Sequence, residues 1–195
     1  MIESILVKRE AKAKTKFTVK SLLSVGLVAL ATILPMLVHL AVGAQGGMVW
    51  LPMYLPVVIG GVLLGTLWGV GIAIASPLVS FIITSIVSSP MPALSRLPFM
   101  IVELVVFALV CGLFSKLIAK KVWVTPIAVV SSIVAGRLVF LALVAIFESV
   151  SSLSVSMVLS QIVAGWPGVI MLVALTTILT LILNKTLNRE AIWQT

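Results

Sequence analysis

The chain has 195 residues, of which 62% are hydrophobic and only 9% are charged, and its formal net charge is +8. Because a soluble domain carries about a quarter charged residues, this chain has too little polar surface to cover a globule in water. The composition therefore predicts an all-α integral membrane protein. The basic residues flank hydrophobic segments, so they indicate membrane orientation rather than binding to nucleic acid.

The first predicted element follows a basic N-terminal segment, residues 1–16. That segment is expected to lie in the cytoplasm, either as an amphipathic helix on the membrane surface or as a flexible tail. Residues 17–42 form the first predicted span. Pro35 should kink it, because proline cannot donate a helical hydrogen bond, and His39 lies near its outer end.

Residues 50–98 are almost wholly apolar and rich in proline at both ends. We expect two short helical segments, residues 57–64 and 69–87, joined at a tight turn that begins with Gly65. The prolines before the first segment predict that no regular helix starts ahead of Pro56. Two short helices between proline-rich loops are expected to form the floor and rim of a small-molecule pocket.

Three further spans are predicted, at residues 99–118, 126–147 and 165–183, with a Ser-rich loop at 148–160. Together with the preceding segments they give a bundle of six transmembrane helices. The domain organisation is then a cytoplasmic segment (1–16), a membrane domain (17–185) and a cytoplasmic tail (186–195).

The distribution of Lys and Arg orients this bundle. With both termini in the cytoplasm, the basic residues of the two ends and of the loop after residue 118 all lie on the inner side, and Arg96 alone falls in an outer loop. This asymmetry favours six spans with both termini cytoplasmic in a multi-pass membrane protein.

Two ionisable residues fall inside predicted spans, Glu103 and Arg137. An ionisable group within a membrane is costly unless it is paired, and it marks a candidate functional site. The two spans are antiparallel neighbours, so the guanidinium can reach the carboxylate. A structural ion pair and a contact with substrate both remain open.

The other candidate substrate-binding residues all fall near the outer side of the predicted bundle. They are His39, Met53, Tyr54, Met91, Arg96 and Trp166. Methionines suit an irregular ligand, and Trp166 can either stack on a ring or anchor the interface. A lone histidine and a lone cysteine, Cys111, predict neither a metal site nor a disulfide.

The sequence has no Walker A motif, no HExxH, no G-x-S-x-G and no acidic cluster for magnesium. We therefore expect neither ATP hydrolysis, nor a catalytic centre, nor a cofactor.

The chain resembles the substrate-binding S components of energy-coupling factor (ECF) transporters. The resemblance is carried by His39, by residues 51–80 and the Ser-Ser-Pro-Met-Pro loop, by Glu103, by Ala-Gly-Arg at 135–137 and by Gly-Trp-Pro-Gly at 165–168. It implies six helices in a bacterial cytoplasmic membrane and an outward-facing vitamin pocket. Transport would be powered by a T component and two ATPase subunits.

The resemblance leaves the vitamin and the docking surface open. The His-bearing first span and the Leu-Pro-Met segment look most like the cobalamin subgroup, and haem, pantothenate, pyridoxine or a pyrimidine precursor are alternatives. Many S components dock the T component through an Ala-x-x-x-Ala pattern, whereas this chain offers Val25, Gly26 and Ala29. A solitary carrier or an intramembrane enzyme are the alternatives from other classes.

Overall fold

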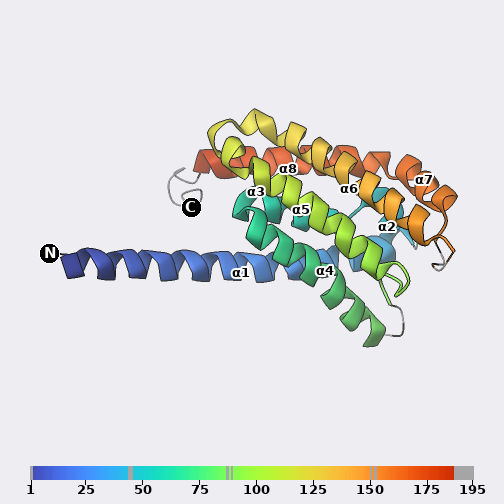
Figure 1. The fold of residues 1–195 in the computed structure, drawn as a ribbon, viewed down its shortest axis with the longest axis horizontal. Coiled ribbons are helices and arrows are strands. Elements are labelled where there is room, and N and C mark those ends of the chain that lie inside the picture. Colours follow the sequence, from blue (N-terminus) through green and yellow to red (C-terminus); the bar gives the residue numbers. More distant parts are fainter. Residues whose placement is uncertain are drawn as a thin grey trace.

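A computed structural model describes residues 2–43, 46–86, 88, 90–149, 151 and 153–186. Within these residues the regular structure is entirely helical (Figure 1). The elements are α1 (Ile2–Val42), α2 (Gly46–Trp50), α3 (Tyr54–Leu64), α4 (Thr66–Ile86), α5 (Leu97–Lys120), the 3₁₀ turn η1 (Val122–Val124), α6 (Thr125–Phe147), α7 (Val155–Ala164) and α8 (Trp166–Thr186).

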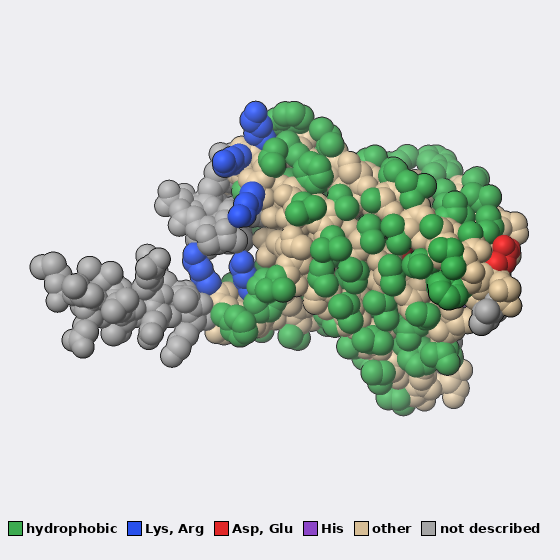
Figure 2. Space-filling model, viewed as in Figure 1, with side chains coloured by type: hydrophobic (Ala, Val, Ile, Leu, Met, Phe, Trp, Pro, Cys, Tyr) green, Lys and Arg blue, Asp and Glu red, His purple; other side chains and the backbone are tan. Residues whose placement is uncertain are grey.

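Five of the described helices are long and apolar enough to cross a membrane. They are α1, α4, α5, α6 and α8, and α3 is shorter, although it is apolar and largely buried. Exposed Leu, Ile, Val and Phe side chains cover the outside of the bundle (Figure 2). An apolar exterior of this extent is what a hydrocarbon environment requires, so the fold is that of a multi-pass membrane protein.

Helix α5 is the centre of the bundle, because it packs against α3, α4 and α6. Its buried face carries Leu104, Phe107, Ala108 and Cys111, which form the main core together with residues of α3 and α6. Helix α1 packs on the outer side of α3 and α4, and α8 packs on α6. A smaller core around Phe140 attaches α7 to the end of α6.

The two ends of the bundle differ in charge. Lys and Arg side chains gather at one end, where the N-terminal part of α1 and the C-terminal end of α8 also lie (Figures 1 and 2). The described basic side chains from these segments and from the α5–α6 turn are Lys16, Lys20, Lys116, Lys120, Lys121 and Lys185. The loops that join α1 to α3, α4 to α5 and α6 to α8 lie at the opposite end. The bundle thus has a basic end and an end formed by its long connections.

Gly65 alone separates α3 from α4. Its backbone lies at φ +85° and ψ −178°, a region that side chains other than glycine essentially do not enter. A reversal of chain direction in one residue therefore depends on glycine. It allows α3 and α4 to pack closely along their length.

We expect Gly65→Ala to lower the free energy of unfolding by about 1–3 kcal/mol, the usual cost of such backbone strain. The matched control is Gly71→Ala on α4, where an added Cβ meets no atom within 4 Å. Because alanine is a better helix former, the control should be neutral or stabilising by up to about 1 kcal/mol. Unfolding of the protein in mixed micelles, followed by circular dichroism, measures both. Equal effects of the two substitutions would contradict the strained turn.

The structure departs most clearly from the predicted elements at three places. Helix α1 continues without interruption from Ile2, so the basic N-terminal segment is a helix in line with the first span. Helix α3 begins at Tyr54, ahead of Pro56, because proline is tolerated in the first turn of a helix, where its missing N–H has no partner to lose. Part of the predicted Ser-rich loop forms α7, whose start is capped by Ser154 accepting a hydrogen bond from the backbone N–H of Met157.

Candidate functional site

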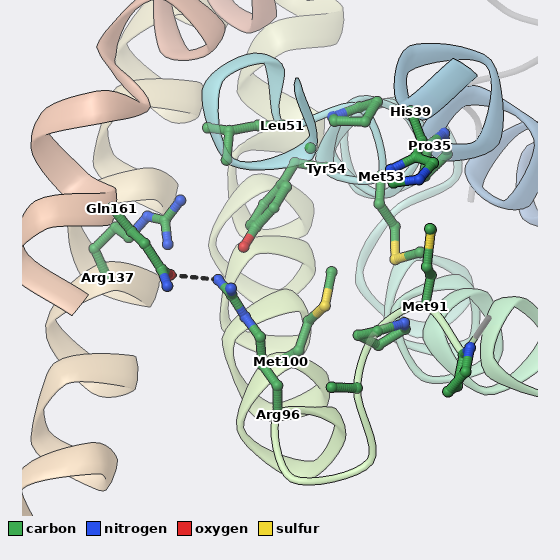
Figure 3. A pocket seen from close by; sticks show the side chains of 15 residues that line it. Pro35, His39, Leu51, Met53, Tyr54, Met91, Arg96, Met100, Arg137 and Gln161 are labelled. Carbon is green, nitrogen blue, oxygen red and sulfur yellow. Dashed lines mark hydrogen bonds between the residues drawn. The ribbon is translucent and has the colours of Figure 1, made fainter. Parts of the chain in front are cut away.

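A cavity of about 300 Å³ lies at the end of the bundle opposite the basic end. Its walls come from the C-terminal part of α1, the segment before α3, the loop between α4 and α5, and α7 (Figure 3). The lining residues are Pro35, His39, Gly47, Leu51, Pro52, Met53, Tyr54, Pro90, Met91, Pro92, Ala93, Arg96, Met100, Arg137 and Gln161. Segments far apart in the sequence therefore meet around one space.

Two polar residues, Arg137 and Tyr54, form the floor of the cavity, and a third, Glu103, contacts both from beneath. Arg137 Nη1 on α6 lies 3.0 Å from Glu103 Oε1 on α5. The other carboxylate oxygen, Oε2, accepts a hydrogen bond of 2.7 Å from the Tyr54 hydroxyl at the start of α3. The Arg137 guanidinium also lies over the Tyr54 ring, 5.3 Å from its centre. The ion pair that the sequence predicts between two neighbouring spans is thus present, and Tyr54 joins it to a third helix.

The three residues differ in how far they are buried. Glu103 is completely buried, whereas Arg137 and Tyr54 reach the cavity surface. Glu103 therefore lies below the floor and stabilises it rather than lining the cavity. A buried carboxylate requires partners of this kind, because an unpaired charge in a medium of low dielectric constant is very costly.

The short helix α3 explains why a cavity exists here. Tyr54, its first residue, bonds to Glu103. Glu103 lies about 9 Å along α5 from that helix's start, at a rise of 1.5 Å per residue. Helix α3 therefore begins well below the end of the bundle at which the cavity lies. The loop that contains Leu51 and Met53 lies above the start of α3. This loop lines one part of the cavity and does not fill it.

Arg96 lies at the side of the cavity, just before α5. Its Nη2 donates a hydrogen bond of 2.6 Å to Oε1 of Gln161 on α7 (Figure 3). Its guanidinium carbon also lies 5.7 Å from the centre of the Phe140 ring on α6. These contacts hold Arg96 in place, and they connect the α4–α5 loop to α6 and α7 across the cavity.

The remaining walls are mostly apolar. Three methionines, Met53, Met91 and Met100, present flexible side chains from three different segments (Figure 3). Prolines supply rigid apolar faces beside them. A few fixed polar groups among apolar walls are typical of a site for a small organic ligand.

The structure brings together most of the candidate residues that the sequence predicts. His39, Met53, Tyr54, Met91, Arg96 and Arg137 line the cavity, and Glu103 lies beneath it. Trp166 lies outside the lining, with 62% of its surface exposed. The sequence reasoning missed Gln161, although it is a polar residue three positions after the buried Val158 and hence on the inner face of α7.

The predicted docking residues lie far from this cavity. Val25, Gly26 and Ala29 are exposed on the outer face of α1. Val25 and Ala29 also line an apolar groove of about 660 Å³ between α1 and α4, which includes Gly71 and Ala75 of α4. The small residues on both helices suit close packing by a further helix.

Among the residues that the structure describes, no cluster of His, Cys, Asp or Glu side chains could hold a metal ion. No family model, no curated protein and no solved structure matches this chain.

Proposed function

We propose that this protein is the substrate-binding S component of an ECF-type vitamin uptake transporter. The observation that carries the proposal is the cavity with a charged floor, which lies at the end of the bundle opposite the lysines. Because Lys and Arg favour the cytoplasmic side, this cavity faces the outside. In the proposed role the protein captures a solute in this cavity, and partner subunits supply the energy for transport.

The proposed topology has six crossings and both termini in the cytoplasm. Five crossings are made by α1, α4, α5, α6 and α8. The sixth is α3, which alone extends only about 16 Å at 1.5 Å per residue and is completed by the segment before it. The basic residues at one end of the bundle support this orientation.

The size of the cavity favours a small vitamin. Ligand pockets measure roughly 300–1,000 Å³, and this one, at about 300 Å³, lies at the lower limit. Cobalamin and haem are bulky macrocycles. Among the ligands that the family resemblance leaves open, pantothenate, pyridoxine or a pyrimidine precursor therefore fits the cavity better than cobalamin does.

A T component and two ATPase subunits are the proposed partners, and they would power transport from the cytoplasmic side. The exposed face of α1 around Val25, Gly26 and Ala29 is the proposed docking surface. Uptake of the vitamin by cells should stop when the genes for the ATPase subunits are deleted. Uptake that persists in their absence would instead support a solitary carrier.

We expect one vitamin to raise the thermal stability of the purified protein in detergent. A ligand at 100 times its Kd stabilises the folded state by about 2.7 kcal/mol. Thermal unfolding with pantothenate, pyridoxine, a pyrimidine precursor, cobalamin and haem provides the measurement. If none of them stabilises the protein, the proposed function is wrong.

A pair of neighbouring substitutions locates the binding site. Ala93 lines the cavity, whereas the adjacent Leu94 is 67% exposed and does not line it. Ala93→Trp should obstruct the cavity and abolish the stabilisation. Leu94→Trp adds a similar bulk next to it and should leave the stabilisation unchanged. Retention of binding by Ala93→Trp would place the ligand elsewhere.

A further inference from the structure

The charge balance of the cavity identifies a feature of its ligand. Of the two guanidinium groups in the lining, that of Arg137 is already paired, because it lies 3.0 Å from the Glu103 carboxylate. Removing one partner of such a buried pair strands the other charge. Arg137 and Glu103 therefore neutralise each other, and Arg137 is not available to balance a charged ligand.

Arg96 is in a different position. The described contacts of its guanidinium are the neutral Gln161 amide and the neutral Phe140 ring. The sequence contains no aspartate, and its glutamates are Glu3, Glu10, Glu103, Glu148 and Glu190. Among the side chains that the structure describes, none of these carboxylates lies within ion-pair distance of Arg96. The half-buried guanidinium thus adds one uncompensated positive charge to the cavity.

The geometry leaves Arg96 able to bind a further group. A guanidinium has five N–H donors arranged in a fork, and one hydrogen bond to Gln161 is described. The hydrogen bond and the Phe140 ring fix its position, so little conformational entropy is lost when it binds a ligand. A planar carboxylate matches the fork of a guanidinium with two parallel hydrogen bonds.

From these observations we infer that the ligand is a small monocarboxylate whose anionic group binds Arg96 and whose apolar body contacts the methionines and prolines. This inference deepens the proposed function and rests on it. A single uncompensated charge matches a monoanion. The apolar walls and the volume of about 300 Å³ limit the rest of the molecule to a compact, mostly apolar body.

Pairs of compounds in which a neutral amide or alcohol replaces the carboxylate test the inference. Pantothenate and panthenol, nicotinate and nicotinamide, and biotin and biotinamide each pair an acid with a neutral analogue, and benzoate with benzamide adds a pair outside the vitamins. Binding of each compound to the full-length protein in detergent is measured by titration calorimetry and thermal unfolding. We expect one acid to bind about 10- to 100-fold more tightly than its neutral partner, the range for a hydrogen bond to a charged group.

Substitution of Arg96 tests whether this residue causes the preference for the acid over its neutral analogue. Arg96→Gln should weaken binding of the preferred acid by about 10- to 100-fold and leave the affinity for its neutral analogue nearly unchanged. The control is Lys121→Gln, which removes the same charge at the basic end of the bundle, on an exposed residue. Lys121→Gln should preserve the preference for the acid. Circular dichroism of each variant verifies that it is folded.

The outcomes separate this inference from the proposed function. If a neutral vitamin binds as tightly as any acid, or if Arg96→Gln retains the preference for the acid, the monocarboxylate inference is wrong and the vitamin-binding function stands. If benzoate binds through Arg96 and no vitamin does, the inference stands and the proposed function is wrong. If neither these compounds nor any vitamin of the thermal-unfolding screen binds, both are wrong.

Discussion

Replacing Glu103 with glutamine is expected to lower the free energy of unfolding by about 3–5 kcal/mol, because it strands the buried Arg137 guanidinium. Arg137→Met should cost a similar amount, since it strands the carboxylate. The double variant should recover much of this loss, because it removes both charges. The amide oxygen introduced by Glu103→Gln could still accept the hydrogen bond that Tyr54 donates to the carboxylate in the native protein.

Unfolding in mixed micelles, analysed as a double-mutant cycle, measures the coupling between the two residues. Glu148→Gln is a suitable control, because Glu148 is exposed and its described contact is a hydrogen bond from the backbone N–H of Val155. Its effect should be within about 0.5 kcal/mol of zero. Additive losses from Glu103→Gln and Arg137→Met would show that the pair does not stabilise the fold.

Gly136→Ala is expected to cost about 1–3 kcal/mol, the usual penalty for overpacking a core. A Cβ at Gly136 would overlap the ring of Phe107 on α5, and Phe107 is completely buried against Tyr54. Because Gly136 precedes Arg137 in the chain, the substitution should also push α6 away from Glu103. We therefore expect weaker ligand binding as well as lower stability.

A matched control and a rescue test this interpretation. Gly26→Ala on α1 adds the same methyl group where no atom lies within 4 Å, and it should not destabilise the protein. Combining Gly136→Ala with Phe107→Leu should recover part of the loss, because leucine occupies less of the space that the new methyl group needs. If Gly136→Ala is as stable as Gly26→Ala, close packing at this position is not required.

The sequence predicted the long helices well because hydrophobicity determines them directly. A run of apolar residues long enough to cross a bilayer leaves few alternatives, since every backbone polar group must be satisfied inside the segment. The predicted spans at 99–118 and 126–147 accordingly lie within α5 and α6 with small shifts at their ends. The pairing of Glu103 with Arg137 was predictable for the same reason, because an unpaired charge at that depth is too costly.

Other parts of the site depend on contacts that a one-dimensional pattern does not contain. Nothing in the sequence near Tyr54 indicates that its hydroxyl reaches Glu103, because the relative height of α3 and α5 decides that contact. Helix α7 was missed because serine has only a modest helix propensity. Its stability comes from Val158, packed with Phe140, and from a serine cap. Gln161 was missed together with the helix that positions it.

Pro35 gives α1 an uneven stiffness along its length. Proline has no N–H, so the helix lacks the backbone hydrogen bond that would otherwise join residue 35 to the carbonyl of Ala31. The same residue lines the cavity, and His39 lies one turn further out. A ligand in this cavity would therefore touch α1 at its most easily bent point. We expect filling of the cavity to alter the tilt of the turns of α1 that follow Pro35, while the part of the helix before Pro35 keeps its direction.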